Sequence, residues 1–300
     1  MSSEFRVWSF KTNTPNSKLI TPNYLRENMG KIEKKKIWMG ALMVPPVIFL
    51  IALGPPSILF LMVLLATFLG LREFYNLALP QSKQVERYVG IVLGLILSLI
   101  IAYSDAKIVP LFIVLLLLFL SIIFMGTSEN LSSAIANIGI TFFGIFYIGF
   151  LLSHVSLIRK MGDGRAWVLF LTTTIWAGDI FAFLSGSLFG KHKLYPKISP
   201  KKTYEGLGGA IVGTVIVALV FARLFIPNLH SGPCILLAIG LGILGQLGDF
   251  TESMLKRSAQ VKDSGSLIPG HGGMLDRLDS FLFSAPFLHY SLLYLLKETP

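Results

Sequence analysis

A succession of long apolar stretches constrains this chain more than any other feature. A helix needs about 20 apolar residues to cross roughly 30 Å of hydrocarbon, and nine stretches approach or reach that length. They lie at 37–53, 57–71, 89–103, 109–124, 134–157, 167–189, 206–225, 234–250 and 280–296. The sequence therefore predicts an all-α, polytopic integral-membrane helical bundle with about nine transmembrane helices. Because Gly54-Pro55-Pro56 divides the first two short stretches, this pair is interpreted either as two crossings or as a re-entrant hairpin.

Composition and layout favour a single membrane domain. Hydrophobic residues make up 53% of the chain and charged residues only 14%, which differs from the usual composition of soluble domains. We expect residues 31–300 to form one membrane-embedded domain, whose part 167–296 carries the functional site. Residues 1–30 are polar and lack the apolar core of a signal peptide, so we interpret them as a tail or an expression leader. The single cysteine, Cys234, excludes an intrachain disulfide.

The basic residues predict which side of the membrane each polar segment occupies. The net charge of +10 lies mainly beside helix ends, which indicates orientation and lipid contact and not nucleic-acid binding. Four lysines precede the first stretch: Lys31, Lys34, Lys35 and Lys36. An inside N-terminus then places 72–88, 190–205 and 251–279 on the cytoplasmic side as well. Segment 158–166 does not fit this assignment, because it is basic but the count of crossings places it on the outer side of the membrane.

Three carboxylates are expected to converge at the membrane edge. Asp249 lies on the same helix face as Gly242 and Gly245, and small residues mark a face that meets another helix. Asp276 and Asp279 have i, i+3 spacing at the start of the last helix. Neighbouring acids need a compensating cation, and Mg²⁺ takes carboxylates together with substrate phosphates. The alternative is that Asp276 and Asp279 pair with nearby basic residues as a solvated helix cap.

Two polar segments add phosphate-binding features to these acids. The loop Pro269-Gly270-His271-Gly272-Gly273 permits a tight turn of backbone N–H groups, which favours an anion. Lys256, Arg257 and Lys262 supply positive charge nearby. The second segment runs from Ser199 to Gly206, and its lysines alone would also suit a positive membrane flank. Asp179 lies within an apolar stretch, where a carboxylate is either functional or internally paired. The loop therefore indicates a site for metal and phosphate at the membrane surface.

The same polar residues resemble the signature of the CDP-diacylglycerol synthases, also called phosphatidate cytidylyltransferases. The resemblance is carried by Ser253-x-Leu255-Lys256-Arg257-x4-Lys262-Asp263-x-Gly265-x2-Ile268-Pro269-x-His271-Gly272-Gly273-Met274-x-Asp276-Arg277-Leu278-Asp279. A second segment, Ser199-Pro200-Lys201-Lys202-Thr203-x-Glu205-Gly206, is also similar to this family. The resemblance implies an integral-membrane enzyme that joins CTP and phosphatidate into CDP-diacylglycerol and pyrophosphate.

The resemblance also implies roles for individual residues. Asp249, Asp276 and Asp279 would hold Mg²⁺, with or without a second cation, against the CTP phosphates. The candidate catalytic residues are Asp249, Asp276, Asp279, Lys262, Asp263 and His271. The candidate substrate-binding residues are Lys256, Arg257, Gly272, Gly273, Ser199, Lys201, Lys202 and Glu205. Among these, Ser199, Lys201 and Lys202 are assigned to the phosphatidate headgroup.

Two other functions remain open from the residues alone. A related enzyme would transfer the cytidylyl group to another lipid phosphate or a long-chain alcohol. A cation-coupled transporter would use Asp179 and Asp249 to carry ions, but that reading leaves the basic glycine loop without a purpose. We expect an inner-membrane location with the site facing the cytoplasm. The Gly209-x3-Gly213 pattern permits close helix contacts within one chain or in a homodimer.

Overall fold

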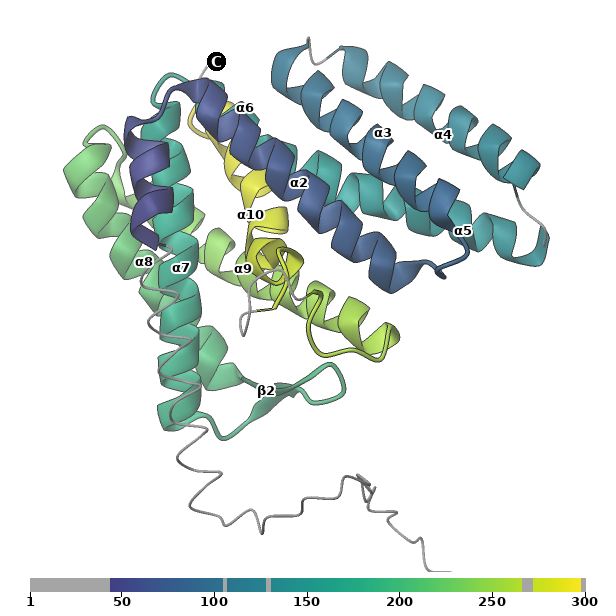
Figure 1. Cartoon of the computed structure of the whole chain (residues 1–300). Coiled ribbons are helices and arrows are strands. Elements are labelled where there is room, and N and C mark those ends of the chain that lie inside the picture. Colours follow the sequence, from purple (N-terminus) through teal and green to yellow (C-terminus); the bar gives the residue numbers. More distant parts are fainter. Residues whose placement is uncertain (1–43, 105–106, 128–130, 266–271, 298–300) are drawn as a thin grey trace, which may run out of the picture. The chain divides into compact units, whose positions relative to one another are not determined.

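The computed structural model describes residues 44–104, 107–127, 131–265 and 272–297, and most of them are helical. Figure 1 shows the arrangement of these helices. A short helix, Val44–Leu53, precedes the longer ones. The helices that follow it are α2 (Pro56–Ala78), α3 (Gln84–Tyr103), α4 (Ile108–Thr127), α5 (Leu131–Gly144), the π-helix η1 (Ile145–Phe150) and α6 (Leu151–Lys160). The remaining helices are α7 (Gly164–Phe189), α8 (Tyr204–Phe225), α9 (Ser231–Ser258) and α10 (Leu275–Tyr294).

The predicted all-α, polytopic membrane fold is confirmed, but the predicted number of crossings is not. Among the described residues, seven helices are long and apolar enough to cross a membrane, with α5, η1 and α6 joined into one of them. Of the first predicted stretch, 37–53, the described part forms only the short helix Val44–Leu53. The last, α10, is not one of the seven, because polar residues recur along it, including Asp276, Asp279, Ser284 and His289.

Two helices extend beyond the apolar stretches that predicted them. Helix α2 continues to Ala78, where the prediction ended at 71, because Phe74 and Tyr75 remain buried and keep the helical packing face intact. Helix α9 continues to Ser258, where the prediction ended at 250. These extensions place Glu73, Glu252 and Lys256 on helices instead of in loops, which matters for the site described below.

A small antiparallel hairpin, absent from the predicted fold, lies between α7 and α8. Its strands are β1 (Lys193–Tyr195) and β2 (Ser199–Thr203), with Lys193 opposite Thr203 and Tyr195 opposite Ser199. The Thr203 hydroxyl accepts a hydrogen bond from the Gly206 N–H and so caps the start of α8. The hairpin therefore leads directly into α8 and keeps β2 next to its first turn.

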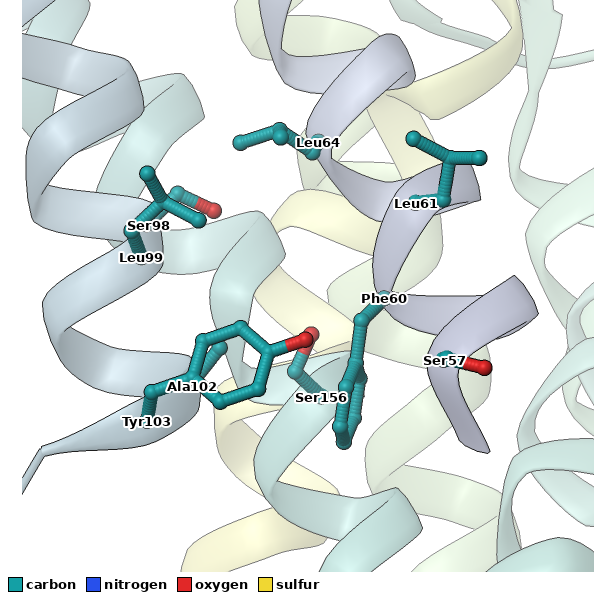
Figure 2. A pocket seen from close by; sticks show the side chains of 9 residues that line it. All are labelled: Ser57, Phe60, Leu61, Leu64, Ser98, Leu99, Ala102, Tyr103 and Ser156. Carbon is teal, nitrogen blue, oxygen red and sulfur yellow. The ribbon is translucent and has the colours of Figure 1, made fainter. Parts of the chain in front are cut away.

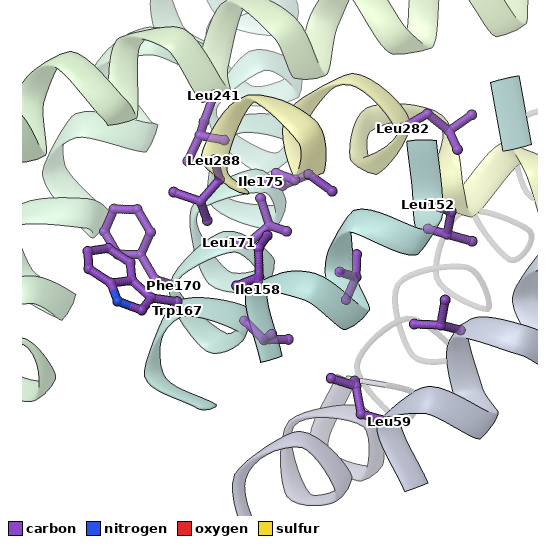
Figure 3. Close-up of a cluster of buried hydrophobic side chains, with 14 of the residues drawn as sticks. Leu59, Leu152, Ile158, Trp167, Phe170, Leu171, Ile175, Leu241, Leu282 and Leu288 are labelled. Atoms are coloured by element: carbon purple, nitrogen blue, oxygen red, sulfur yellow. The ribbon is translucent and has the colours of Figure 1, made fainter. Parts of the chain in front are cut away.

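The four helices α7 to α10 form the packed group that carries the site. Helix α7 lies along α8, α8 along α9, and α9 along α10, and α2 and α6 join this group through α10. Figure 3 shows the core that these contacts bury, including Trp167 and Phe170 of α7, Leu241 of α9 and Leu288 of α10. In a membrane, the helix bundle is stabilised by close contact between the helices. Burial away from lipid contributes little, because lipid is as apolar as the side chains.

The Gly209-x3-Gly213 pattern is used for contact within this chain. A Cβ atom at Gly209 would lie 1.7 Å from the Ser185 hydroxyl oxygen, and one at Gly213 would lie 2.4 Å from the Phe181 ring. Both neighbours belong to α7. These glycines therefore bring α8 against α7 of the same chain, and they do not supply an argument for the homodimer left open above.

Candidate active site

Three carboxylates from α9 and α10 come together at one end of the bundle. Oxygen atoms of Asp249, Glu252 and Asp279 all lie within 4.8 Å of one another. Asp249 and Glu252 are three residues apart on α9, so their side chains project from the same face. Helix α10 approaches this face closely at Gly248, where a Cβ would lie 2.1 Å from the Asp279 carbonyl oxygen. The absence of a side chain at Gly248 thus brings Asp279 to the two acids of α9.

Two lysines neutralise part of this negative charge. The Lys202 Nζ lies 2.7 Å from the Asp249 Oδ2, and the same ammonium lies 4.3 Å from the centre of the Phe250 ring. Lys256 forms ion pairs with Glu252, whose side chain is fully buried, and with Asp276 at 2.6 Å. Both lysine side chains are less than one fifth exposed, so the two ammonium groups belong to the interior of the site.

Asp276 lies beside the three-carboxylate group without being a member of it. Its Oδ1 accepts from the Lys256 Nζ, and its Oδ2 accepts from the N–H groups of Ser264 (3.0 Å) and Gly273 (2.7 Å). Burial acts to raise the pKa of Asp276, but the neighbouring side chains of Glu252 and Lys256 and the Gly273 N–H hold this pKa well below its ordinary value. The predicted trio of Asp249, Asp276 and Asp279 is therefore not the trio that the structure gathers.

The end of the glycine loop wraps around Asp276. Gly272 has a φ of +80°, in the region that favours glycine, and a Cβ there would lie 2.4 Å from the Asp276 Oδ2. Ser264 contributes its N–H and its hydroxyl to the same carboxylate oxygen. His271, predicted to contact phosphate, lies outside the described residues. The described ends of the loop are thus held by Asp276.

Glu73 is a member of this site that the sequence analysis missed. Its carboxylate accepts from the N–H of Met274 and from the N–H of Leu275, each at 2.9 Å, and from the Ser264 hydroxyl at 3.0 Å. The partners are about 200 residues away in sequence, and the apolar count had placed position 73 in a loop. Glu252 was also missed. Its spacing from Asp249 and Lys256 on one helix is the signal that identifies it.

The second polar segment lies close to the acids, as its predicted place on the same membrane side requires. Lys202 on β2 contacts Asp249 as described, and the Arg257 Nε donates to the Ile198 carbonyl at 3.3 Å. Glu205 does not reach the acids, because its carboxylate binds the His192 ring at 2.7 Å and the His192 N–H. Ser199 is half-buried, and Lys201 is exposed. The hairpin is thus held against α9 by two contacts.

A pocket of about 460 Å³ opens beside Asp249. Its charged lining comes from Asp179, Lys193, Lys201, Lys202 and Asp249. Apolar side chains complete the wall: Ala182, Phe183, Leu194 and Leu207. Such a mixed lining suits a molecule with a charged group and an apolar body.

Asp179 and two residues of the loop after α9 were also candidates for a functional role. Asp179 lies at the same pocket, where the Gln246 Nε2 donates to its Oδ1 at 3.4 Å. It thus has an internal polar partner as well as a place in the pocket wall. Lys262 and Asp263 are exposed on the loop that follows α9, and neither forms an ion pair within the described part of the chain. Their predicted roles stay predictions.

The residues present fit a hard divalent cation. Each of Asp249, Glu252 and Asp279 offers a carboxylate oxygen, the ligand that Mg²⁺ prefers. Glu252, which is fully buried, and Asp276 share one ammonium group, that of Lys256. Because these carboxylates lie so close together, additional positive charge would stabilise their ionised forms. Mg²⁺ itself is an expectation from this chemistry, since other hard cations have the same preference.

A different cavity does not belong to this site. It measures about 240 Å³ and lies between α2, α3 and α6, lined by Phe60, Leu64, Leu99 and Tyr103 together with small residues (Figure 2). None of its lining residues is shared with the pocket beside Asp249, and none is a carboxylate or a lysine. The carboxylates suited to a cation thus lie at the ends of α9 and α10, away from this cavity.

The fold and the site define an integral membrane protein with an acidic, cation-suited centre. The model of the cytidylyltransferase family matches residues 34–295, and the chain belongs to this family. It is 40% identical over 188 residues to the phosphatidate cytidylyltransferase of Bacillus subtilis, covering 61% of this chain and 67% of that protein. It is 33% identical over 240 residues to the phosphatidate cytidylyltransferase of Staphylococcus epidermidis, and this match covers 79% of this chain and 90% of that protein. The predicted family is thus confirmed.

Proposed function

We propose that this protein transfers the cytidylyl group of CTP to phosphatidate, giving CDP-diacylglycerol and pyrophosphate. The observation that carries this proposal is the meeting of Asp249, Glu252 and Asp279, of which Asp249 also lines the pocket that contains Lys193, Lys201 and Lys202. Membership of the cytidylyltransferase family supports the nucleotide, and the names of the relatives support the lipid.

The reaction needs charge neutralisation more than it needs a covalent intermediate. A phosphatidate oxygen attacks the α-phosphorus of CTP, a new P–O bond forms, and the bond from that phosphorus to the pyrophosphate oxygen breaks. A phosphatidate phosphate is already ionised near neutral pH, so no general base is required. A bound divalent cation would supply neutralisation of the triphosphate charge. The carboxylates of Asp249, Glu252 and Asp279 would hold it, and Asp276 would keep the loop in place.

The pocket wall suits the lipid reactant. Lys193 and Lys201 lie on the hairpin at the pocket, and their ammonium groups would bind the phosphatidate phosphate. Phe183 and Leu207 supply apolar surface at the same pocket, where the lipid body would enter. Lys202 links the lipid pocket to the carboxylates, since it lines the pocket and pairs with Asp249. Ser199 keeps its predicted place near this headgroup.

The nucleotide would occupy the loop side of the acids. Arg257 and Lys262 are exposed there, and positive side chains at this position would bind the triphosphate. Because Gly272 and Gly273 have no side chains, their backbone can lie close to the Asp276 carboxylate. We propose a cytoplasmic-membrane location with this side facing the cytoplasm, because the segments that meet here, 72–88, 190–205 and 251–279, carry the basic residues that remain inside.

The direct test is formation of CDP-diacylglycerol from labelled CTP and phosphatidate by the purified protein. We expect product with Mg²⁺ and none after chelation. The same assay with a long-chain alcohol phosphate and a long-chain alcohol as acceptors decides between phosphatidate and the alternative acceptors. The Asp279→Asn variant, purified in the same way, controls for contaminating activity. Absence of CDP-diacylglycerol from folded wild-type protein, with product from another acceptor, would reject phosphatidate as the substrate.

A further inference from the structure

Glu73 lies on α2, outside the helices that supply the three carboxylates. Its side chain is buried, with 9% of the residue exposed, in a chain where a buried acid is costly unless it is hydrogen-bonded. Two of its hydrogen-bonding partners, Ser264 and Met274, belong to the segment that joins α9 to α10, and the third, Leu275, is the first residue of α10. One residue of α2 therefore connects the first part of the chain to the site.

The place that Glu73 occupies is the start of α10. The first N–H groups of a helix lack partners within the helix, and Met274, which precedes the first residue of α10, makes no capping hydrogen bond with its own side chain. The Glu73 Oε1 accepts from the Met274 N–H and the Oε2 from the Leu275 N–H. A carboxylate is also favoured by the positive end of a helix dipole. Glu73 thus caps α10 from another helix.

The surrounding segment is shaped to admit this carboxylate. A Cβ at Gly273 would lie 2.2 Å from the Glu73 Oε2, and a Cβ at Gly265 would lie 2.6 Å from the Oε1. The Ser264 hydroxyl lies 3.0 Å from the Glu73 Oε2 and 2.9 Å from the Asp276 Oδ2. The cap of α10 and the anchor of the loop, Asp276, are therefore joined through one hydroxyl group.

We propose that Glu73 is a positioning residue for the transfer reaction. By fixing the first turn of α10, it sets where Asp279 stands relative to Asp249 and Glu252 on α9. Asp279 lies four residues after Leu275, about one helical turn along α10, so a shift at the capped end moves this carboxylate directly. The proposal rests on the proposed function for its effect on catalysis, but the cap itself is independent of that function.

The test compares the isosteric variant Glu73→Gln with the matched control Glu86→Gln. Glu86 is also a buried acid on a neighbouring helix, but its partner is Lys83 at 3.1 Å, and within the described residues no ion pair or hydrogen bond joins it to α10. Ser264→Ala is the second variant, because it removes one partner of Glu73 and leaves the carboxylate in place. Two readouts are taken on the full-length protein: hydrogen exchange of the Met274 and Leu275 amides, and the dependence of kcat and KM on Mg²⁺.

In Glu73→Gln we expect exchange of these two amides to be about tenfold faster or more, because an amide cannot cap both N–H groups as a carboxylate does. We expect kcat to fall by about ten- to a hundredfold and the half-saturating Mg²⁺ concentration to rise, with the KM for phosphatidate unchanged. Ser264→Ala should show the same changes to a smaller degree, and Glu86→Gln should show none. A merely structural role for Glu73 would lower the folded fraction and leave the Mg²⁺ dependence of the folded enzyme unchanged.

Failure of the two proposals is distinguishable. Unchanged amide exchange in Glu73→Gln would overturn the cap, and if that variant does not fold, unchanged exchange in Ser264→Ala would do so. Faster exchange with unchanged Mg²⁺ dependence would overturn the positioning role. A third outcome is faster exchange of the Met274 and Leu275 amides in Glu73→Gln combined with a wild-type protein that makes no CDP-diacylglycerol. This outcome would reject the proposed function but would support the cap.

Discussion

The Nζ of Lys202 lies 2.7 Å from the Oδ2 of Asp249. This ion pair connects the hairpin that lines the proposed lipid pocket to the acidic group that suits a cation. Its two partners come from segments separated by the whole of α8, and they are brought together because α8 and α9 are antiparallel neighbours. The group proposed to bind the lipid phosphate and a group proposed to bind the cation are thus in direct contact.

The ion pair predicts the behaviour of Lys202→Met. Removing the ammonium leaves Asp249 without its counter-charge, so a cation should bind at a lower concentration. The lipid phosphate loses a positive contact at the same time, so kcat should fall by about tenfold or more. Titration of activity with Mg²⁺ measures both effects. Lys197→Met, an exposed lysine in the turn of the hairpin, is the control and should behave as wild type. Unchanged kcat and Mg²⁺ dependence in Lys202→Met would contradict this role.

Glu252→Gln tests the carboxylate that the sequence analysis did not include. If Glu252 is a cation ligand, this variant should lose activity to a similar extent as Asp279→Asn, by about a hundredfold or more, and should need more Mg²⁺. Steady-state rates over a range of Mg²⁺ concentrations check the expectation. Asp163→Asn changes an exposed acid beside the start of α7, remote in sequence from the site, and should retain full activity. Near-normal rates in Glu252→Gln would remove it from the ligand set.

Asp276→Asn should act mainly on stability. The Asp276 side chain is 11% exposed, pairs with Lys256 and accepts two backbone N–H groups. Breaking such a buried pair costs about 3–5 kcal/mol, so thermal unfolding in detergent should begin at a clearly lower temperature. Asp279→Asn should unfold close to the wild-type temperature, because the Asp279 side chain accepts only the neighbouring Ser280 N–H among the described residues. Equal unfolding temperatures for Asp276→Asn and wild type would show that the loop does not depend on this carboxylate.

Gly248→Ala tests the close approach of α9 and α10. The added Cβ would lie 2.1 Å from the Asp279 carbonyl oxygen, so the two helices must separate and Asp279 must move away from Asp249. We expect lower activity together with a lower unfolding temperature. Gly208→Ala is the matched control, because a Cβ there meets nothing within 4 Å and alanine favours a helix. A Gly248→Ala enzyme with wild-type activity would mean that the observed spacing is not required.

Removal of divalent cations gives a test at the level of the whole site. Treatment with a chelator should abolish formation of CDP-diacylglycerol, and added Mg²⁺ should restore it. Restoration with Mn²⁺ but not with Zn²⁺ would agree with an oxygen-ligand site, since zinc prefers nitrogen and sulfur ligands. Activity that persists after complete chelation would contradict a cation role for the three carboxylates.

Most of the fold was predictable from sequence because membrane helices are specified locally. Each of the seven helices that are long and apolar enough to cross a membrane is marked by its own apolar residues, and no long-range contact is needed to recognise it. The helix ends were less predictable. Charged residues such as Arg72 and Glu252 ended the apolar count, whereas the helices continue past them into the polar edge of the membrane. The two missed carboxylates, Glu73 and Glu252, lie on such extensions.

The sequence by itself determined the membrane class, the family signature and the placement of Asp249 and Asp279 at facing helix ends. Only the tertiary structure decided that Glu252 joins them, that Asp276 holds the loop, and that Glu73 caps α10. These relations depend on how α2, α9 and α10 pack, and Glu73 is about 200 residues from its partners. A one-dimensional pattern records the spacing of residues along one helix, but it does not record which face of a distant helix will lie against it.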